Sequence, residues 1–229
     1  INIGNPVLLA KVNEIPQATM QAIYTIEPNN ITIVGGTSVI SQDVESQLRN
    51  YAPLTRIAGA NRYETNALTI SGTDIPATVA SGENWPDALS ASNLGNQIFL
   101  VKHDSIPNAT MQALTAANPY SIIIVGGTGA VSQQVEEGLK PYCQPSNSIY
   151  RQVTRLAGAD RYATNLLTIG DFSTLNVVTG RDFPDALAAG YLNDQILLFD
   201  GQQLPDWCFG AMDYNFIGGV DKEAFEAIK

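Results

Sequence analysis

The sequence predicts an α/β fold in which repeated units are built on parallel β-sheets. Two observations lead to this prediction: the chain repeats itself, and each copy alternates short apolar runs with segments of helical period. Residues 98–101 and 122–125 are apolar without interruption, as in strands of a parallel sheet that helices cover on both faces. Helical periods follow these runs, beginning at Asn108 and at Ser132. Each repeat therefore contains strand, helix, strand and helix in that order.

The repeat has two parts, which we call half A and half B. Half B runs from a Pro-led helix to the helix after a Val-Gly-Gly motif: residues 15–49 match residues 106–140 without a gap, and residues 204–220 are a fainter copy. Half A contains an Arg-x-Ala-Gly segment, within residues 55–70 and 154–169, followed by a Pro-Asp-Ala-Leu (PDAL) segment. The order along the chain is B, A, B, A, B.

Residues at the expected helix starts suit helix N-termini. Ser41 and Ser132 precede amphipathic stretches, where a serine hydroxyl accepts from unpaired helical N–H groups. In both PDAL segments, proline fixes the first-turn dihedral, and Asp87 or Asp185 lies at the positive end of the helix dipole. Helix-start chemistry therefore explains the PDAL segments without catalysis.

An aromatic residue precedes Pro-Asp in both copies, Trp85 in the first and Phe183 in the second. Aromatic rings can stack on sugars, and they also fill cores. Because the ring recurs at one place in the repeat, we expect a core anchor at both positions.

The composition excludes several partners. Of the 229 residues, 12 are Lys or Arg and 22 are Asp or Glu, which gives a formal net charge of −10. This charge predicts repulsion from nucleic acids and from anionic bilayers. No apolar run approaches the roughly 18 residues of a membrane span. We expect neither a nucleic-acid partner nor membrane insertion.

Few residues suit catalysis or metal binding. The chain has one histidine, His103, and its two cysteines lack CxxC spacing, so we expect no metal and no cofactor. The Val-Gly-Gly turns lack the lysine of a phosphate-binding loop, and no nucleophile elbow is present. The remaining candidate is a glycosidase-like carboxylate pair, such as Asp87 with Asp185 or with Glu83. Since the same aspartate recurs in both copies, we expect it to serve the fold or a repeated binding site, and we predict no enzyme activity.

Four arginines occupy matching places in the two A halves: Arg56, Arg62, Arg155 and Arg161. Their planar guanidinium groups can hold the carboxylates or phosphates of a ligand. The alternative, which we favour, is that each arginine pairs with Asp87 or Asp185, or bonds to backbone carbonyls, within its own unit. The four arginines and the two aspartates are the candidate ligand-binding residues.

The cysteines and two sequons bear on the cellular compartment. Cys143 and Cys208 leave two alternatives open, one disulfide in an oxidising compartment or two buried thiols, and of these we predict the disulfide. N-glycosylation sequons begin at Asn30 and Asn108, and they matter only in a secreted eukaryotic product. The sequons favour a secreted glycoprotein.

Together these motifs resemble the type 2 cell-wall-binding repeat family. The resemblance rests on RIAGANRYETN and RLAGADRYATN, on SGENWPDALSA and TGRDFPDALAA, and on IVGGTSVIS and IVGGTGAVS, in the same order over nearly the whole chain. It implies tandem Rossmann-like, flavodoxin-like units that lack a nucleotide and pack around a pseudo-threefold axis. It also implies a secreted bacterial surface module that is anchored non-covalently to the wall through an anionic polysaccharide.

Carried over to this chain, the family pattern predicts complete repeat units at residues 56–140 and 155–229. Residues 1–50 are then the second half of a unit, and residues 141–154, where the copies are spaced further apart, are a loop insertion. We expect all of these to pack as one compact module. The first unit lacks its half A, which fits either removal of upstream residues or a branch with two and a half units.

The leading functional hypothesis is a secreted, non-catalytic protein that binds cell-wall or extracellular polysaccharide through the half-A arginines and the grooves between units. We expect it outside the cell or on the wall. The alternative is a structural protein that self-associates or binds another protein. A third hypothesis, a small glycan hydrolase that uses Asp87 or Asp185, lacks support from any catalytic group outside the repeat.

Overall fold

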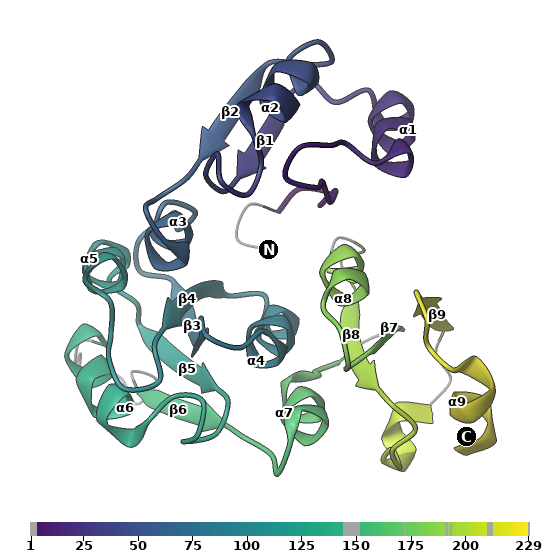
Figure 1. Ribbon diagram of the computed structural model, residues 1–229. Helices are drawn as coiled ribbons and strands as arrows, with labels where there is room; N and C mark the ends of the chain where they lie inside the picture. The colour runs from purple at the N-terminus through teal and green to yellow at the C-terminus, as the bar shows by residue number, and fades with distance from the viewer. Residues whose placement is uncertain are drawn as a thin grey trace.

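In the part of the chain that the structure describes, three parallel β-sheets follow one another (Figure 1). The structure is a computed structural model that describes residues 4–143, 152–171, 173–190, 192, 194–209 and 213–228. In Figure 1 the three sheets, with their helices, surround a common centre. The predicted α/β fold with parallel sheets is confirmed.

The first sheet is built by the N-terminal half B and by the segment that follows it. Strand β1 (Ile31–Val34) pairs in parallel with β2 (Leu54–Ile57). Helices α1 (Gln17–Ile26) and α2 (Gln42–Leu48) contribute Ile23, Val44 and Leu48 to its core.

The second sheet has four strands in the order β4-β3-β5-β6. They are β3 (Pro76–Ser81), β4 (Gln97–Val101), β5 (Ser121–Val125) and β6 (Val153–Leu156). Ala77 and Val79 of β3 pack in one core, whereas Ala80 packs in another, so the two faces of this strand are both covered. Burial on both faces explains why these strands are continuously apolar in sequence.

Helices and short 3-10 turns surround the second sheet. They are α3 (Arg62–Ala67), α4 (Pro86–Ser90), η1 (Ala91–Leu94), α5 (Asn108–Ala117), α6 (Gln133–Leu139) and η2 (Lys140–Tyr142). The predicted serine caps are confirmed: Ser41 Oγ accepts from the Val44 N–H at 3.4 Å, and Ser132 Oγ accepts from the Val135 N–H at 3.3 Å.

The third sheet has the order β8-β7-β9. Its elements are α7 (Arg161–Thr168), β7 (Thr174–Thr179), α8 (Pro184–Ala189), β8 (Gln195–Phe199), η3 (Asp206–Phe209), β9 (Asp213–Ile217) and α9 (Lys222–Ile228). Phe225 of α9 is fully buried against β7 and β8 residues on one face of this sheet. On the other face, Ala186 of α8 and Leu89 of α4 share one cluster, so the second unit helps to cover the third sheet.

Strands of half A complete the sheets of the preceding half B. Strand β2 pairs with β1, and β6 pairs with β5, although β2 and β6 contain the Arg-x-Ala-Gly arginines that open each half A. The sheets therefore cross the predicted unit boundaries at residues 56 and 155. Of the predicted loop insertion, residues 144–151 lie outside the described residues.

The second and third units are joined through α4, η1 and α7, which lie side by side (Figure 1). Asn93 of η1 donates through Nδ2 to the Ile196 carbonyl at 2.9 Å and to Thr168 Oγ1 at 3.1 Å. Its Oδ1 accepts from the Ile196 N–H at 2.7 Å. One asparagine of the second unit thus bonds to the outer strand of the third sheet.

The predicted disulfide between Cys143 and Cys208 is wrong. Both residues are buried thiols, and they lie in two different hydrophobic clusters, Cys143 under the second sheet and Cys208 under the third. Each cysteine fills the core of its own sheet, which keeps the two sulfur atoms apart.

The two sequon asparagines differ in their surroundings. Asn30 and Asn108 are exposed, but Thr110 of the second sequon is buried and donates to the Leu100 carbonyl at 2.7 Å. Use of these sequons stays a prediction.

Candidate functional site

Arg56, in β2, is held by the half B that precedes it. Its Nε and Nη2 donate to Glu45 Oε2 at 2.9 and 2.7 Å, and its Nη1 donates to the Gly35 carbonyl at 2.7 Å. The hydrogen bond from Arg56 is the main cause that lowers the pKa of Glu45. Arg56 therefore ties α2 to the Val-Gly-Gly turn.

Arg155, in β6, repeats this arrangement. It donates to Glu136 Oε2 at 3.0 and 2.8 Å and to the Gly126 carbonyl at 2.7 Å. The carboxylate partner of each arginine is thus a half-B glutamate and not Asp87 or Asp185. Each arginine also bonds to a backbone carbonyl, as the second of the expected arrangements requires. Both arginines have side chains less than one fifth exposed, at 16% and 14%.

Arg62 and Arg161, at the first position of α3 and α7, bond to a different turn. Arg62 donates to the Gly82 carbonyl, and Arg161 donates to the Gly180 carbonyl at 2.9 Å. These glycines follow β3 and β7, at the carboxyl ends of the strands. The two arginines therefore lie where a parallel sheet presents its loops to ligands.

Arg161 also reaches the preceding unit. Its guanidinium carbon lies 5.4 Å from the centroid of the Trp85 ring, a cation–π distance. The Trp85 ring in turn lies 6.4 Å from the ring of Phe183, tilted by 56°. We call Trp85, Arg161 and Phe183 the aromatic junction.

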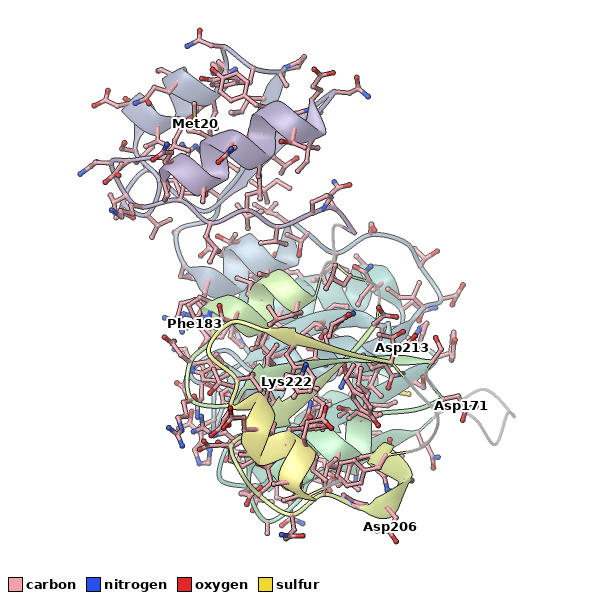
Figure 2. All side chains as sticks on the ribbon, turned by 90° about the vertical axis from the view of Figure 1, so that its right-hand side faces the viewer. Met20, Asp171, Phe183, Asp206, Asp213 and Lys222 are labelled. Atoms are coloured by element: carbon pink, nitrogen blue, oxygen red, sulfur yellow. The ribbon has the colours of Figure 1, made fainter. Side chains whose placement is uncertain are left out.

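The aromatic junction forms where two PDAL helices begin. Trp85 directly precedes α4, and Phe183 directly precedes α8. Phe183 is 45% exposed, and Figure 2 shows it at the surface, whereas Trp85 is half-buried. The expectation of two core anchors is therefore wrong for Phe183, because nearly half of this residue is exposed.

Asp87 packs against the second Val-Gly-Gly turn, and Asp185 packs against the matching Ile-Gly-Gly turn of the third unit. A methyl group on Gly126 would overlap the carboxylate of Asp87, and a methyl group on Gly218 would overlap that of Asp185. Burial raises the pKa of Asp87, and the Arg161 charge opposes this rise. The repeated aspartate thus fits closely against the repeated glycine, which accounts for both motifs.

Helices α3 and α7 are counterparts in the repeat. The face of α7 that packs on α4 is buried, whereas the matching face of α3 is only partly covered. Asn165 and Thr168 of α7 are 0% and 2% exposed, whereas the matching Asn66 and Thr69 are only half-buried. Among the described residues, α7 packs on α4 and η1, but α3 packs mainly on α5 and β4. Because α3 lacks the cover that α4 gives to α7, Arg62 is also exposed.

Sequence reasoning missed three groups of functional or supporting residues. They are the glutamates Glu45 and Glu136, the asparagines Asn66 and Asn165, and the cluster of Tyr162, Arg181 and Asp200. The first two groups recur at matching places in the repeat, and this recurrence was the available signal. The third group occurs in one unit, so the repeat did not mark it.

Within the part of the chain that the structure describes, no cluster of three His, Cys, Asp or Glu side chains is arranged to hold a metal ion. In the same residues, no helix has both the length and the apolar character needed to cross a membrane. The candidate site is therefore an arrangement of aromatic rings, guanidinium groups and carboxylates. Such a set can stack on a flat ring and bond to hydroxyl or acid groups.

The three parallel sheets and the repeated turns define a tandem α/β repeat protein. Residues 56–136 and 155–221 match the family described as "Cell wall binding domain 2 (CWB2)". The chain belongs to this family of cell-wall-binding domains.

Curated relatives from Bacillus subtilis (strain 168) extend the comparison. The chain is 30% identical over 217 residues to the protein named "Amidase enhancer", covering 89% of this chain and 29% of that protein. It is 27% identical over 217 residues to "N-acetylmuramoyl-L-alanine amidase LytC", covering 87% of this chain and 41% of that protein. The chain therefore spans less than half the length of these relatives.

Solved structures share the fold. Cwp6 from Clostridium difficile superposes with a TM-score of 0.82 at 21% identity, over 99% of this chain and 40% of that one. Cwp8 from the same organism gives a TM-score of 0.79 at 24% identity, over 97% of this chain and 42% of that one.

Proposed function

We propose that this chain binds a cell-wall or extracellular polysaccharide, as a non-catalytic part of a secreted protein. The observation that carries the proposal is the aromatic junction, where Arg161 stacks on Trp85 beside the exposed ring of Phe183. Aromatic faces stack on sugar rings, and a guanidinium group bonds to hydroxyl or acid groups along a glycan.

The distribution of charge supports local recognition. Arg56 and Arg155 are engaged with glutamates, so they add little positive potential at the surface. Arg62 and Arg161 lie at the loop end of the sheets, beside Asp87 in the case of Arg161. Although the net charge of the chain is −10, we expect these arginines to attract an acidic polymer locally, so binding should weaken as salt increases.

A non-catalytic role fits the roles of the two aspartates. Asp87 packs against Gly126 of a Val-Gly-Gly turn, and Asp185 packs against Gly218 of the matching Ile-Gly-Gly turn. An amidase enhancer and an amidase both contain a stretch similar to this chain, which favours a shared wall-binding part over shared chemistry.

The test is co-sedimentation of the pure protein with isolated wall material across a salt series. The material is used before and after acid extraction of its polysaccharide. We expect binding to unextracted wall that falls with salt and disappears on extraction. Absence of binding at every salt concentration would reject the proposal.

A second candidate is association with another copy of the chain, which the half-open face of α3 favours. Asn66 on this face is less buried than its counterpart Asn165 on α7. Sedimentation velocity at several concentrations tests it. A sedimentation coefficient that rises with concentration supports self-association, and a constant monomer value rejects it.

A further inference from the structure

A pocket of about 220 Å³ opens at the carboxyl ends of the strands of the third sheet. Its lining includes Thr179 at the end of β7, Asp200 after β8, and Gly219 after β9, together with Arg181 and Asp221. Open α/β sheets bind ligands at this edge, because the loops there converge.

One of the turns that line this pocket is short. In the first two units, four residues separate the Gly-Gly pair from the serine that caps the next helix, at 37–40 and 128–131. In the third unit only Val220 separates Gly219 from Asp221, which caps α9 by accepting from the Ala224 N–H at 2.9 Å. The turn is therefore three residues shorter than its counterparts.

The longer turn of the other units closes the same edge. The Ser41 N–H donates to the Val12 carbonyl at 2.8 Å, and the Ser132 N–H donates to the His103 carbonyl at 2.8 Å. The bond from Ser132 ties its turn to the loop that follows the outer strand β4, and the bond from Ser41 ties its turn to the segment that precedes α1. In the third unit the lining residues Gly201 and Gly219 border an open pocket at this place.

The rim of the pocket has its own charges. Arg181 forms an ion pair with Asp200, which also accepts from the Tyr162 hydroxyl at 3.1 Å. In the second unit, Glu83 and Lys102 occupy the matching positions, so the signs are reversed. The hydrogen bond from Arg181 lowers the pKa of Asp200, which keeps this carboxylate ionised.

We propose that this pocket binds a single sugar ring that is neutral or cationic, and not an acidic one. The inference rests on the proposed polysaccharide binding and deepens it by naming the kind of sugar unit. Asp200 and Asp221 accept from sugar hydroxyls, because each carboxylate has about four acceptor positions and the protein uses only some of them. Arg181 donates to ring or hydroxyl oxygens.

Size and charge set the specificity. Drug-sized ligands occupy pockets of about 300 Å³ or more, so we expect a pocket of this volume to hold one sugar ring. Two carboxylates against one guanidinium group give the lining a net negative charge, which disfavours an anionic sugar.

The binding test uses the whole chain and three monosaccharides: glucose, glucosamine and glucuronate. Amide chemical shifts of Gly201 and Gly219 are followed by NMR during titration, with Gly127, at the closed edge of the second sheet, as the internal control. We expect glucose and glucosamine to shift the first two amides, while glucuronate shifts neither. If no sugar shifts them, or if glucuronate binds best, the inference is wrong.

Two variants locate the binding. Insertion of Thr-Gly-Ala after Gly219, which copies residues 128–130 of the second unit, is expected to close the pocket and abolish the shifts. Asp221→Ser keeps a helix cap like Ser132 but removes a carboxylate, and we expect about tenfold weaker binding. The control repeats the same insertion after Gly127 and should leave sugar binding unchanged. Unchanged binding in both pocket variants would overturn the inference.

Wall co-sedimentation separates this inference from the proposed function. If the two pocket variants lose the sugar-induced chemical-shift changes but still bind the wall, the pocket is a secondary sugar site in addition to the aromatic junction. Wall binding by a wild-type protein that shows no sugar shifts contradicts the pocket alone. Absence of both contradicts the pocket and the proposed function together.

Discussion

Asn66 and Asn165 make the same pair of backbone hydrogen bonds to the outer strands of two different sheets. Asn66 donates to the Ile98 carbonyl at 2.8 Å and accepts from the Leu100 N–H at 2.9 Å. Asn165 donates to the Ile196 carbonyl at 3.0 Å and accepts from the Leu198 N–H at 2.8 Å. Each asparagine bonds to the edge strand as a neighbouring strand would, and so anchors the half-A helix to the sheet.

The two asparagines should differ in their contribution to stability. Asn165 is fully buried, so Asn165→Ala leaves buried backbone groups without this partner, and we expect a loss of about 2 to 4 kcal/mol. Asn66 is half-buried and water can replace it, so Asn66→Ala should cost about 1 kcal/mol. Urea unfolding of both variants measures the difference. Equal losses of unfolding free energy in the two variants would show that burial of α7 under α4 does not strengthen the contribution of Asn165.

Glycines in the second Val-Gly-Gly turn offer a matched pair of substitutions. Gly126 has φ of +118°, and a methyl group there would overlap Asp87, whereas Gly127 has no atom near the position of a methyl group. We expect Gly126→Ala to destabilise the protein by about 2 to 4 kcal/mol and Gly127→Ala to change stability by less than about 0.5 kcal/mol. Thermal unfolding of the two variants checks this, and similar melting temperatures would argue against the packing of Asp87 on Gly126.

Acid should weaken the ion pair between Arg56 and Glu45. Arg56 lowers the pKa of Glu45 in the folded protein below the 4.5 of an unperturbed glutamate. The folded state therefore binds this proton less readily, so the stabilisation is present above pH 4.5 and is lost as pH falls through the folded pKa. We expect Arg56→Gln to flatten the pH dependence of stability between pH 6 and pH 3, measured by urea unfolding.

Arg49 provides the control for that experiment. It also bonds to Glu45, but its side chain is 55% exposed. Arg49→Gln should change the acid dependence less than Arg56→Gln does, because solvent screens an exposed pair. The reverse order would contradict the assignment of Arg56 as the main partner.

Both cysteines should behave as buried thiols. Burial raises the pKa of Cys208 to about 11, so little thiolate forms at neutral pH and the native protein should resist alkylation at this site. After denaturation without reductant, intact mass should show two labelled thiols. A protein that takes up no label under these conditions would carry the disulfide that the structure lacks.

The repeated motifs predict local structure well. The continuous apolar runs are strands, the two serines cap helices, and the PDAL segments begin helices. Each of these features depends on neighbouring residues, which is why the sequence reveals them.

Long-range partners were harder to predict. The pairing of β6 with β5 places Arg155 beside Glu136, a contact that depends on how α6 returns over the sheet. An even number of cysteines says nothing about their distance, so it could not show that Cys143 and Cys208 fill different cores. The shortened turn at Val220 is visible in the sequence, but its consequence, an open edge, appears only in the fold.

Wall binding by matched aromatic variants tests the central claim most directly. Trp85→Ala and Phe183→Ala change the aromatic junction, whereas Tyr24→Ala removes another exposed ring, which packs on Tyr51 in the first unit. Circular dichroism first establishes that all three variants are folded, and co-sedimentation with isolated wall material follows.

We predict that Phe183→Ala weakens wall binding by about tenfold, because the exposed ring offers an apolar face on which a sugar ring can stack. Trp85→Ala should weaken it at least as much, and Tyr24→Ala should leave it unchanged. Equal binding by all three folded variants and the wild type would contradict the assignment of the aromatic junction as the polysaccharide site.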